Sequence, residues 1–325
     1  MKEIIRLFPS PIQHLLKSEV CWKSVQEIRL RVDRPIEILD SSHHQKLKGT
    51  LMTPENLSFV LNQISQFSLY RFKDELKEGF ITIEGGHRVG LAGKANTHHN
   101  EVDTLKHISF MNIRVAKATS GQVESLVPYL YKDGKWQSTL IIGPPHSGKT
   151  TVLRELSKYI GSSHRGYQAA KVAVVDERSE IAASMKGVPQ LEVGERTDVM
   201  DACPKAEGMM MMIRSMSPDV LIVDEIGGET DALAVREATF TGVDVICSIH
   251  GNSLSGVRKR PSANRLIEEQ IFERYLILER MTPAKRRGLT ILDQSGQVLA
   301  TWKGSDSGAM DRSRHHTDGH YVSRF

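Results

Sequence analysis

Hydrophobic and polar residues alternate over residues 27–39, near the start of the chain. The apolar members of this stretch are Ile28, Leu30, Val32, Ile36 and Ile38. A period of two places successive side chains on opposite faces of an extended chain, so the pattern predicts one or two half-buried strands. The stretch Phe80–Leu91, with Gly85-Gly86 at its middle, predicts a tight hairpin. A further strand is predicted over residues 111–115.

A helical spacing follows Thr53. Apolar residues recur there every three or four positions, at Leu57, Val60, Leu61, Ile64 and Phe67. This spacing places them on one face of a helix, and Thr53 followed by Pro54 is typical of a helix start, so an amphipathic helix is predicted over residues 53–70. The first third of the chain therefore predicts a small α+β domain over residues 1–120, with a boundary near residues 117–123.

After that boundary the apolar residues come in short unbroken runs. These runs are Thr139–Ile142, Val172–Val175, Val220–Val223 and Val243–Ile249. Such runs are typical of strands buried on both faces, and helical stretches separate them, as in right-handed crossovers. We predict an α/β domain with a mainly parallel sheet over residues 121–302. The polar tail 303–325 cannot bury enough apolar surface to offset its ordering entropy, so it is predicted to be disordered.

Composition limits the possible classes of protein. The 325 residues are 39% hydrophobic, which is enough for a core in each of two domains. The 43 basic and 39 acidic residues are spread along the chain, so charge alone does not indicate nucleic-acid binding. The three cysteines are far apart, which indicates neither a zinc site nor a disulfide framework and fits the cytoplasm. No apolar run approaches the roughly 20 residues of a membrane-spanning helix, so any membrane contact is expected to be peripheral.

Residues 143–150 read GPPHSGKT and match the pattern GxxxxGK[ST] between a predicted strand and a helix predicted over residues 151–160. Glycines let the backbone curl so that its N–H groups and a helix N-terminus point at phosphate oxygens, while the Lys149 ammonium neutralises phosphate charge. The pattern predicts a P-loop NTPase of the RecA-like type that uses ATP. The predicted nucleotide-binding residues are Gly143, Pro144, Pro145, His146, Ser147, Gly148, Lys149, Thr150 and Thr151.

The run Val220–Val223 ends in two carboxylates, Asp224 and Glu225, as in a Walker B strand. Magnesium keeps several waters and accepts few protein ligands, so the Thr150 hydroxyl and Asp224 are predicted to hold Mg²⁺. Glu225 is predicted to orient and deprotonate the attacking water.

Two other strand ends carry polar residues. Asp176 and Glu177 follow one strand and are predicted to form a second acidic box, the alternative being an ordinary solvated strand end. His250 follows another strand and is predicted to sense the γ-phosphate, the alternative being a structural histidine. Met209–Met212 lie in a predicted helix and are expected to pack in the core.

Five segments resemble the stage III sporulation protein AA family of endospore-forming bacteria and, more distantly, the traffic ATPases of type II secretion and type IV pili. These segments are Glu27–Val32, Gly85–Leu91, Val174–Glu180, Ser217–Asp219 and Val223–Glu225. The resemblance implies a hexameric ATPase in the mother-cell cytoplasm, docked at the membrane on channel proteins that link mother cell and forespore. Its N-terminal domain would bind partners and act as a gate.

The resemblance also implies roles for single residues. The acidic box of these ATPases corresponds to Asp176 and Glu177, and the histidine box corresponds to His250. These residues would act together with Lys149 and Glu225. The secretion ATPases usually have glycine where this chain has Asp224, so the ordinary P-loop arrangement of magnesium ligands is preferred here.

Phosphoryl transfer spreads negative charge over the γ-oxygens, and a ring would let an arginine of one subunit stabilise that charge in its neighbour. Arg178 and Arg214 are the preferred candidates in the catalytic domain, and Arg88 is preferred over Arg114 outside it. Arg196 is a further candidate. For each of them the alternative is a solvated surface side chain.

Two other functions remain open from the sequence. Many P-loop proteins of this size act on nucleic acids, and Arg312 and Arg314 add basic charge to the tail, although no aromatic-studded basic groove is visible. A nucleotide-binding switch is the other alternative, but a switch has less need of a catalytic base such as Glu225.

Overall fold

The computed structural model describes residues 1–40, 43–65, 76, 79–98, 101–116, 123–164, 166–280, 288–303 and 311–312. The chain divides into two compact units. One comprises Met1–Thr119 and Ala182–Leu191, and the other comprises Ser120–Ile181 and Glu192–Phe325. Residues 117–122 of the predicted boundary, the end of the predicted helix after residue 65 and most of the tail 303–325 lie outside the described residues.

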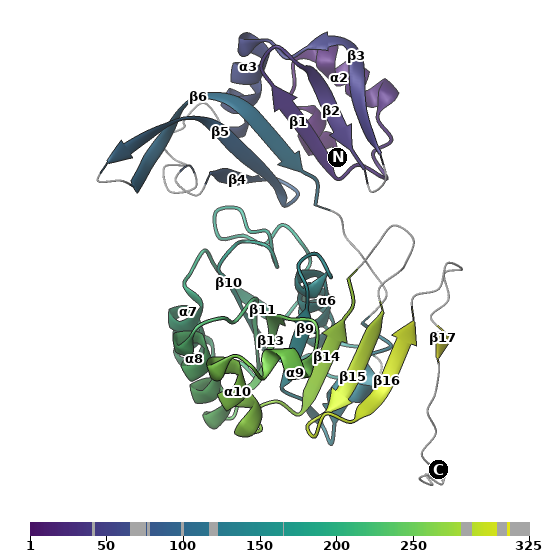
Figure 1. Ribbon diagram of the computed structural model, residues 1–325, viewed down its shortest axis with the longest axis vertical. Coiled ribbons are helices and arrows are strands. Elements are labelled where there is room, and N and C mark those ends of the chain that lie inside the picture. The colour runs from purple at the N-terminus through teal and green to yellow at the C-terminus, as the bar shows by residue number, and fades with distance from the viewer. Residues whose placement is uncertain are drawn as a thin grey trace. The chain divides into compact units, whose positions relative to one another are not determined.

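The first unit is built on an antiparallel sheet with the strand order β3-β2-β1-β6-β5-β4 (Figure 1). Its elements are α1 (Lys2–Ile5), α2 (Ser10–Glu19), β1 (Glu27–Arg31), β2 (Pro35–Leu39), β3 (His44–Leu51), α3 (Pro54–Ser65), β4 (Phe80–Ile83), β5 (His87–His98) and β6 (Glu101–Arg114). The alternating residues of β1 and β2 bury every second side chain, as predicted. Gly85 and Gly86 adopt positive φ in the predicted hairpin turn, which favours glycine.

The second unit contains a mixed sheet whose described strands follow the order β11-β10-β12-β13-β9-β14-β15-β16-β17. Its strands are β9 (Thr139–Gly143), β10 (Val172–Asp176), β11 (Thr197–Asp201), β12 (Val220–Val223), β13 (Asp244–His250), β14 (Arg274–Leu278), β15 (Leu289–Asp293), β16 (Val298–Lys303) and β17 (Asp311–Arg312). Its helices are α5 (Val127–Leu130), α6 (Lys149–Ile160), α7 (Lys205–Met216), α8 (Glu229–Phe240), α9 (Leu254–Val257) and α10 (Pro261–Glu268), and a small hairpin joins β7 (Tyr131–Lys132) to β8 (Lys135–Trp136).

Helices cover both faces of the parallel strands, which explains their unbroken apolar runs. Alternate residues of β9, β10, β12 and β13 enter two separate cores. Helix α6 packs in one core, and α7, α8 and α10 pack in the other. The α/β class is confirmed, while β15 to β17 extend the sheet in antiparallel fashion. Within the run Met209–Met212 of α7, Met209 and Met212 are buried and Met211 is exposed.

The order of the parallel strands brings the candidate residues to one edge of the sheet. β10, β12, β13 and β9 are neighbours, so their carboxyl ends are contiguous. His250 pairs in register with Gly143. Val223 pairs with both Val175 and Cys247, so the residues that follow these strands meet. Among the described residues, no helix is both long and apolar enough to cross a lipid bilayer.

Asp244 is the first residue of β13, at the amino ends of the parallel strands. Its titration makes the free energy of unfolding depend on pH. Burial raises the pKa of its carboxyl to about 6, and the negative charge of Glu273 adds to this. A folded-state pKa above the unfolded value means that the stability from the bound proton is complete below the unfolded pKa and is lost as the pH rises through 6. We expect Asp244→Asn to raise the free energy of unfolding by about 1–2 kcal/mol at about pH 7.5 and to have little effect near pH 4.

Urea unfolding of wild type and Asp244→Asn across this pH range measures the difference. Asp198→Asn, an exposed carboxylate change on strand β11, is the matched control. A stability difference that does not vary with pH would contradict the expected titration of Asp244.

Candidate active site

Two glycines determine the shape of the loop between β9 and α6. Gly148 precedes α6 with a φ of 88°, in the left-handed region that favours glycine. A Cβ on Gly143 would lie 2.3 Å from Ser147 Oγ, so a larger residue there would force the Ser147 side chain to move. His146 is exposed and also has a positive φ, 62°. Thr150 and Thr151 lie in the first turn of α6, whose N-terminal N–H groups face the loop.

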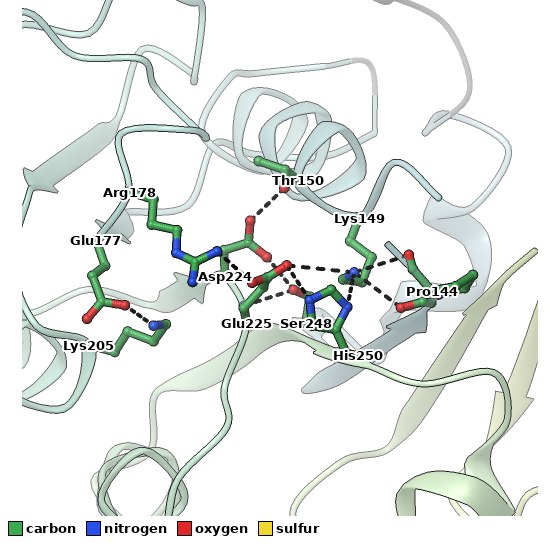
Figure 2. Close-up of polar contacts among 11 residues, drawn as sticks. Pro144, Lys149, Thr150, Glu177, Arg178, Lys205, Asp224, Glu225, Ser248 and His250 are labelled. Carbon is green, nitrogen blue, oxygen red and sulfur yellow. Dashed lines mark hydrogen bonds and ion pairs between the residues drawn. The ribbon is translucent and has the colours of Figure 1, made fainter. Parts of the chain in front are cut away.

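Lys149 is buried at the centre of this loop. Its Nζ donates to the carbonyls of Gly143 (3.2 Å) and Pro144 (3.4 Å) and to His250 Nδ1 (3.1 Å) (Figure 2). Burial lowers the pKa of the Lys149 ammonium, and the nearby carboxylate of Glu225 opposes this change. The loop thus holds one buried cation on partners that phosphate oxygens could replace.

Asp224 lies next to Thr150. The Thr150 hydroxyl donates to Asp224 Oδ2 at 2.6 Å, and the Ser248 hydroxyl donates to Oδ1 (Figure 2). A hydroxyl and a carboxylate oxygen in contact are the kind of hard ligands that magnesium takes from P-loop proteins, while water fills its other positions. The pair therefore fits a Mg²⁺ ion.

Glu225 follows Asp224 and is contacted by side chains from helix α6, strand β13 and the turn after β10. Its Oε1 lies 3.0 Å from His250 Nε2 and 3.8 Å from Lys149 Nζ, and its Oε2 lies 3.2 Å from Arg178 Nη1 (Figure 2). Its backbone has a φ of 51°, and its N–H donates to Ser248 Oγ at 3.0 Å. The carboxylate is one-quarter exposed, so water can reach it.

The contacts of His250 assign its protonation pattern. The Lys149 ammonium has no acceptor, so His250 Nδ1 accepts from it. The proton of a neutral imidazole then lies on Nε2, which donates to Glu225 Oε1. His250 therefore links Lys149 to the carboxylate of Glu225, which follows strand β12.

Asp176 and Glu177 do not share one environment. Asp176 is 1% exposed, and its oxygens accept the backbone N–H groups of Glu180 (2.8 Å) and Ile181 (3.0 Å). It is therefore a buried anchor of the turn that follows β10, and the alternative of a solvated strand end is wrong for it. Glu177 forms an ion pair with Lys205, apart from the group around Glu225 (Figure 2).

The other arginines considered from the sequence have different surroundings. Arg214 is exposed in the last turn of α7, which leads into the start of β12, so it lies at the opposite edge of the sheet from Glu225. Arg196 donates to the Ala169 carbonyl. In the first unit, Arg88 stacks 3.4 Å from the centre of the Phe80 ring and Arg114 lies 3.7 Å from Glu27.

Ser248 is a site residue that the sequence did not single out. It is fully buried within an apolar strand, and its hydroxyl joins the Asp224 carboxylate to the backbone N–H of Glu225. A polar residue inside a run such as VICSIH was the available signal. Arg154, which donates to the Glu180 and Ile181 carbonyls, was also missed.

Ser248→Ala is expected to lower the free energy of unfolding by about 1–3 kcal/mol, because it leaves the partly buried N–H of Glu225 without its acceptor. Urea unfolding measures this, with the exposed Ser215→Ala on α7 as the control. Equal effects of the two substitutions would show that the Ser248 hydroxyl holds nothing in place.

Known proteins share this architecture. A model of the family described as sporulation stage III, protein AA matches residues 1–299. The stage III sporulation protein AA of Bacillus subtilis (strain 168) is 46% identical over 308 residues, which cover 94% of this chain and 99% of that protein. The ATPase DotB of Legionella pneumophila is 14% identical, with a TM-score of 0.60 over 88% of this chain and 81% of that one. The pilus retraction motor PilT with bound ADP, also 14% identical, has a TM-score of 0.59 over 91% and 83%.

At 14% identity, the likeness to DotB and PilT concerns the fold. The family match covers nearly the whole chain, and the Bacillus subtilis relative is matched over nearly its whole length. The chain belongs to the stage III sporulation protein AA family.

Proposed function

We propose that the chain is a magnesium-dependent ATP hydrolase of the RecA-like P-loop class. The observation that carries this proposal is the convergence of Lys149, the Thr150–Asp224 pair and Glu225 at one edge of the parallel sheet. Each has a distinct role in phosphoryl transfer to water. The loop 143–151 cradles the phosphates, Lys149 binds the β- and γ-phosphate oxygens, and Glu225 holds the attacking water.

Binding exchanges partners within the site. Lys149 leaves the Gly143 and Pro144 carbonyls and His250 Nδ1 and donates to the phosphates instead. Thr150 and Asp224 would hold the metal, which when bound neutralises charge on the β- and γ-oxygens. Glu225 takes a proton from water as the water oxygen attacks the γ-phosphorus, and ADP leaves with inorganic phosphate as the second product. His250 then loses its contact with Lys149 but keeps its contact with Glu225, so nucleotide binding changes the surroundings of Glu225.

The kind of work is proposed from the relatives. DotB is an ATPase and PilT a pilus retraction motor, and the family is named for a stage of sporulation. We infer that ATP turnover powers the assembly of, or transport through, a membrane channel complex during endospore formation. The protein would act in the mother-cell cytoplasm at the membrane as a hexamer. Residues 1–120 would be the partner-binding and gating domain, and residues 121–302 the ATPase domain.

A stimulation assay tests this assignment. ATP turnover is measured with single-stranded DNA, with anionic lipid vesicles and with membrane extract from sporulating cells. Stimulation by the membrane samples alone supports the proposal. Stimulation by DNA alone would replace it with a nucleic-acid motor.

A further inference from the structure

The turn that follows β10 is fixed from inside. Both oxygens of the buried Asp176 carboxylate accept backbone N–H groups of Glu180 and Ile181. The Arg154 guanidinium donates to the carbonyls of the same two residues. Burial lowers the pKa of Arg154 and the Asp176 charge opposes this, as expected for two neighbouring buried charges of opposite sign. Helix α6, which carries Arg154, therefore holds this turn in a defined position.

The residues before and after Arg178 are each held by another side chain. Glu177 pairs with Lys205, and the Ser179 hydroxyl donates to Asp201 Oδ1 at 2.6 Å. Arg178 lies between these two anchored residues and points toward Glu225 instead (Figure 2). Its Nη1 donates to Glu225 Oε2 at 3.2 Å.

The strand register forms the contact between Arg178 and Glu225 within a single chain. β10 and β12 are parallel neighbours, with Val175 paired to Val223. Two residues after β10 ends at Asp176, the turn presents Arg178 to the residue that follows Asp224. A contact built from neighbouring strands of one sheet needs no second subunit.

We propose that Arg178 is a positioning residue that orients Glu225 of its own chain, an inference that rests on the proposed hydrolase function. Arg178 holds Oε2 and His250 holds Oε1, so the plane of the carboxylate is set from both sides. A carboxylate has about four lone-pair sites, so one stays available to the attacking water. The Arg178 side chain is 64% exposed, and exposed ion pairs contribute little to stability, so its contribution is to orientation.

The kinetic test compares Arg178→Ala, Arg178→Lys and Arg265→Ala. Arg265 is the matched control, an exposed arginine of the same unit that pairs with Glu229 at 3.3 Å. Arg178→Ala is expected to lower kcat for ATP by about tenfold to a hundredfold, the scale of a misplaced reactive group, while KM stays within about twofold and Tm is unchanged. Arg178→Lys is expected to recover part of kcat, and Arg265→Ala to match wild type. Unchanged or faster turnover in Arg178→Ala would overturn the proposal.

A double-mutant cycle tests the route through Glu225. If Arg178 acts by orienting that carboxylate, then Arg178→Ala adds nothing to Glu225→Gln, and the double variant turns over as slowly as Glu225→Gln alone. Full additivity of the two losses would mean that Arg178 acts elsewhere in the site.

Mixed oligomers distinguish action within a chain from action between chains. Lys149→Ala and Arg178→Ala chains carrying different affinity tags are co-expressed and purified through both tags. Action within the chain predicts no recovery of turnover, because every site keeps one defect, whereas recovery would show that the arginine serves a neighbour. If the chains do not assemble, the loss in monomeric Arg178→Ala already locates the action within one chain.

A spectroscopic readout separates this inference from the hydrolase proposal. The Nε–Hε resonance of Arg178, identified by its absence in Arg178→Lys, is expected to shift in nucleotide-free Glu225→Gln protein. If Glu225→Gln shifts this resonance but the wild type does not hydrolyse ATP, the hydrolase proposal is contradicted and the contact between Arg178 and Glu225 is confirmed. An unmoved resonance would overturn the contact itself.

Discussion

Glu225→Gln is expected to bind ATP with near wild-type affinity while its turnover falls by about 10²–10⁴-fold, the range contributed by a general base. Glutamine has the shape of glutamate, and its amide oxygen can still accept from His250 Nε2. An uncharged amide does not take a proton from water, and it loses the charge that pairs with Arg178. Binding and chemistry should therefore separate in this variant.

Two assays measure that separation. Fluorescent-nucleotide titration gives the dissociation constant, and phosphate release gives kcat, each with magnesium present. Glu237→Gln, an exposed carboxylate change on α8, is the control and should match wild type. Wild-type turnover in Glu225→Gln would remove this residue from the role of base.

Lys149→Ala is expected to lose nucleotide binding itself. The Lys149 side chain is 4% exposed, and its ammonium is the cation that the loop 143–151 surrounds. Without it, the phosphate charge would enter a site that contains the carboxylates of Asp224 and Glu225. Removing one partner of a buried charged hydrogen bond costs about 2–5 kcal/mol of binding free energy, which weakens Kd by roughly 30-fold to several thousandfold. Turnover at cellular ATP concentrations should fall accordingly.

The control for this variant lies on the same helix. Lys158→Ala removes an exposed lysine of α6 that pairs with Glu192, and it is expected to leave nucleotide affinity unchanged. Equal affinity of Lys149→Ala and Lys158→Ala for ATP would mean that nucleotide does not bind in the loop between β9 and α6.

Local patterns correctly predicted the glycine-rich loop before helix α6 and the strand that ends at Val223, just before Asp224. Their residues are consecutive, and the geometry of a glycine-rich turn before a helix depends on neighbours in sequence. The apolar runs also predicted parallel strands correctly, because burial on both faces leaves no polar side.

The contacts around Glu225 depend on strand order, which a single sequence does not contain. Ser248 lies 23 residues from Glu225 and Arg178 lies 47 residues from it. Each reaches it because β10, β12 and β13 are neighbours. The surroundings of Asp176 could not be predicted for a related reason. Its position after a strand predicts part of a second acidic box, and the pattern does not show that the turn folds back and buries its carboxylate under backbone N–H groups.

Strands with mixed polar and apolar residues were also missed. β11 is the outermost strand on one side of the described sheet, and all its residues are at least partly exposed, so it shows no apolar run. β15 and β16 form an antiparallel extension that the parallel pattern did not anticipate. Their place is set by pairing with β14.

Lys149, Thr150, Asp224 and Glu225 are expected to form an ATP-hydrolysing site. The most direct measurement is single-turnover hydrolysis of γ-labelled ATP, with the protein in excess over nucleotide, with magnesium and with EDTA. We expect complete release of labelled phosphate with magnesium, none above background with EDTA, and none in Glu225→Gln over the same time. ATP that stays bound and intact with magnesium present would contradict this expectation and identify the chain as a nucleotide-binding switch.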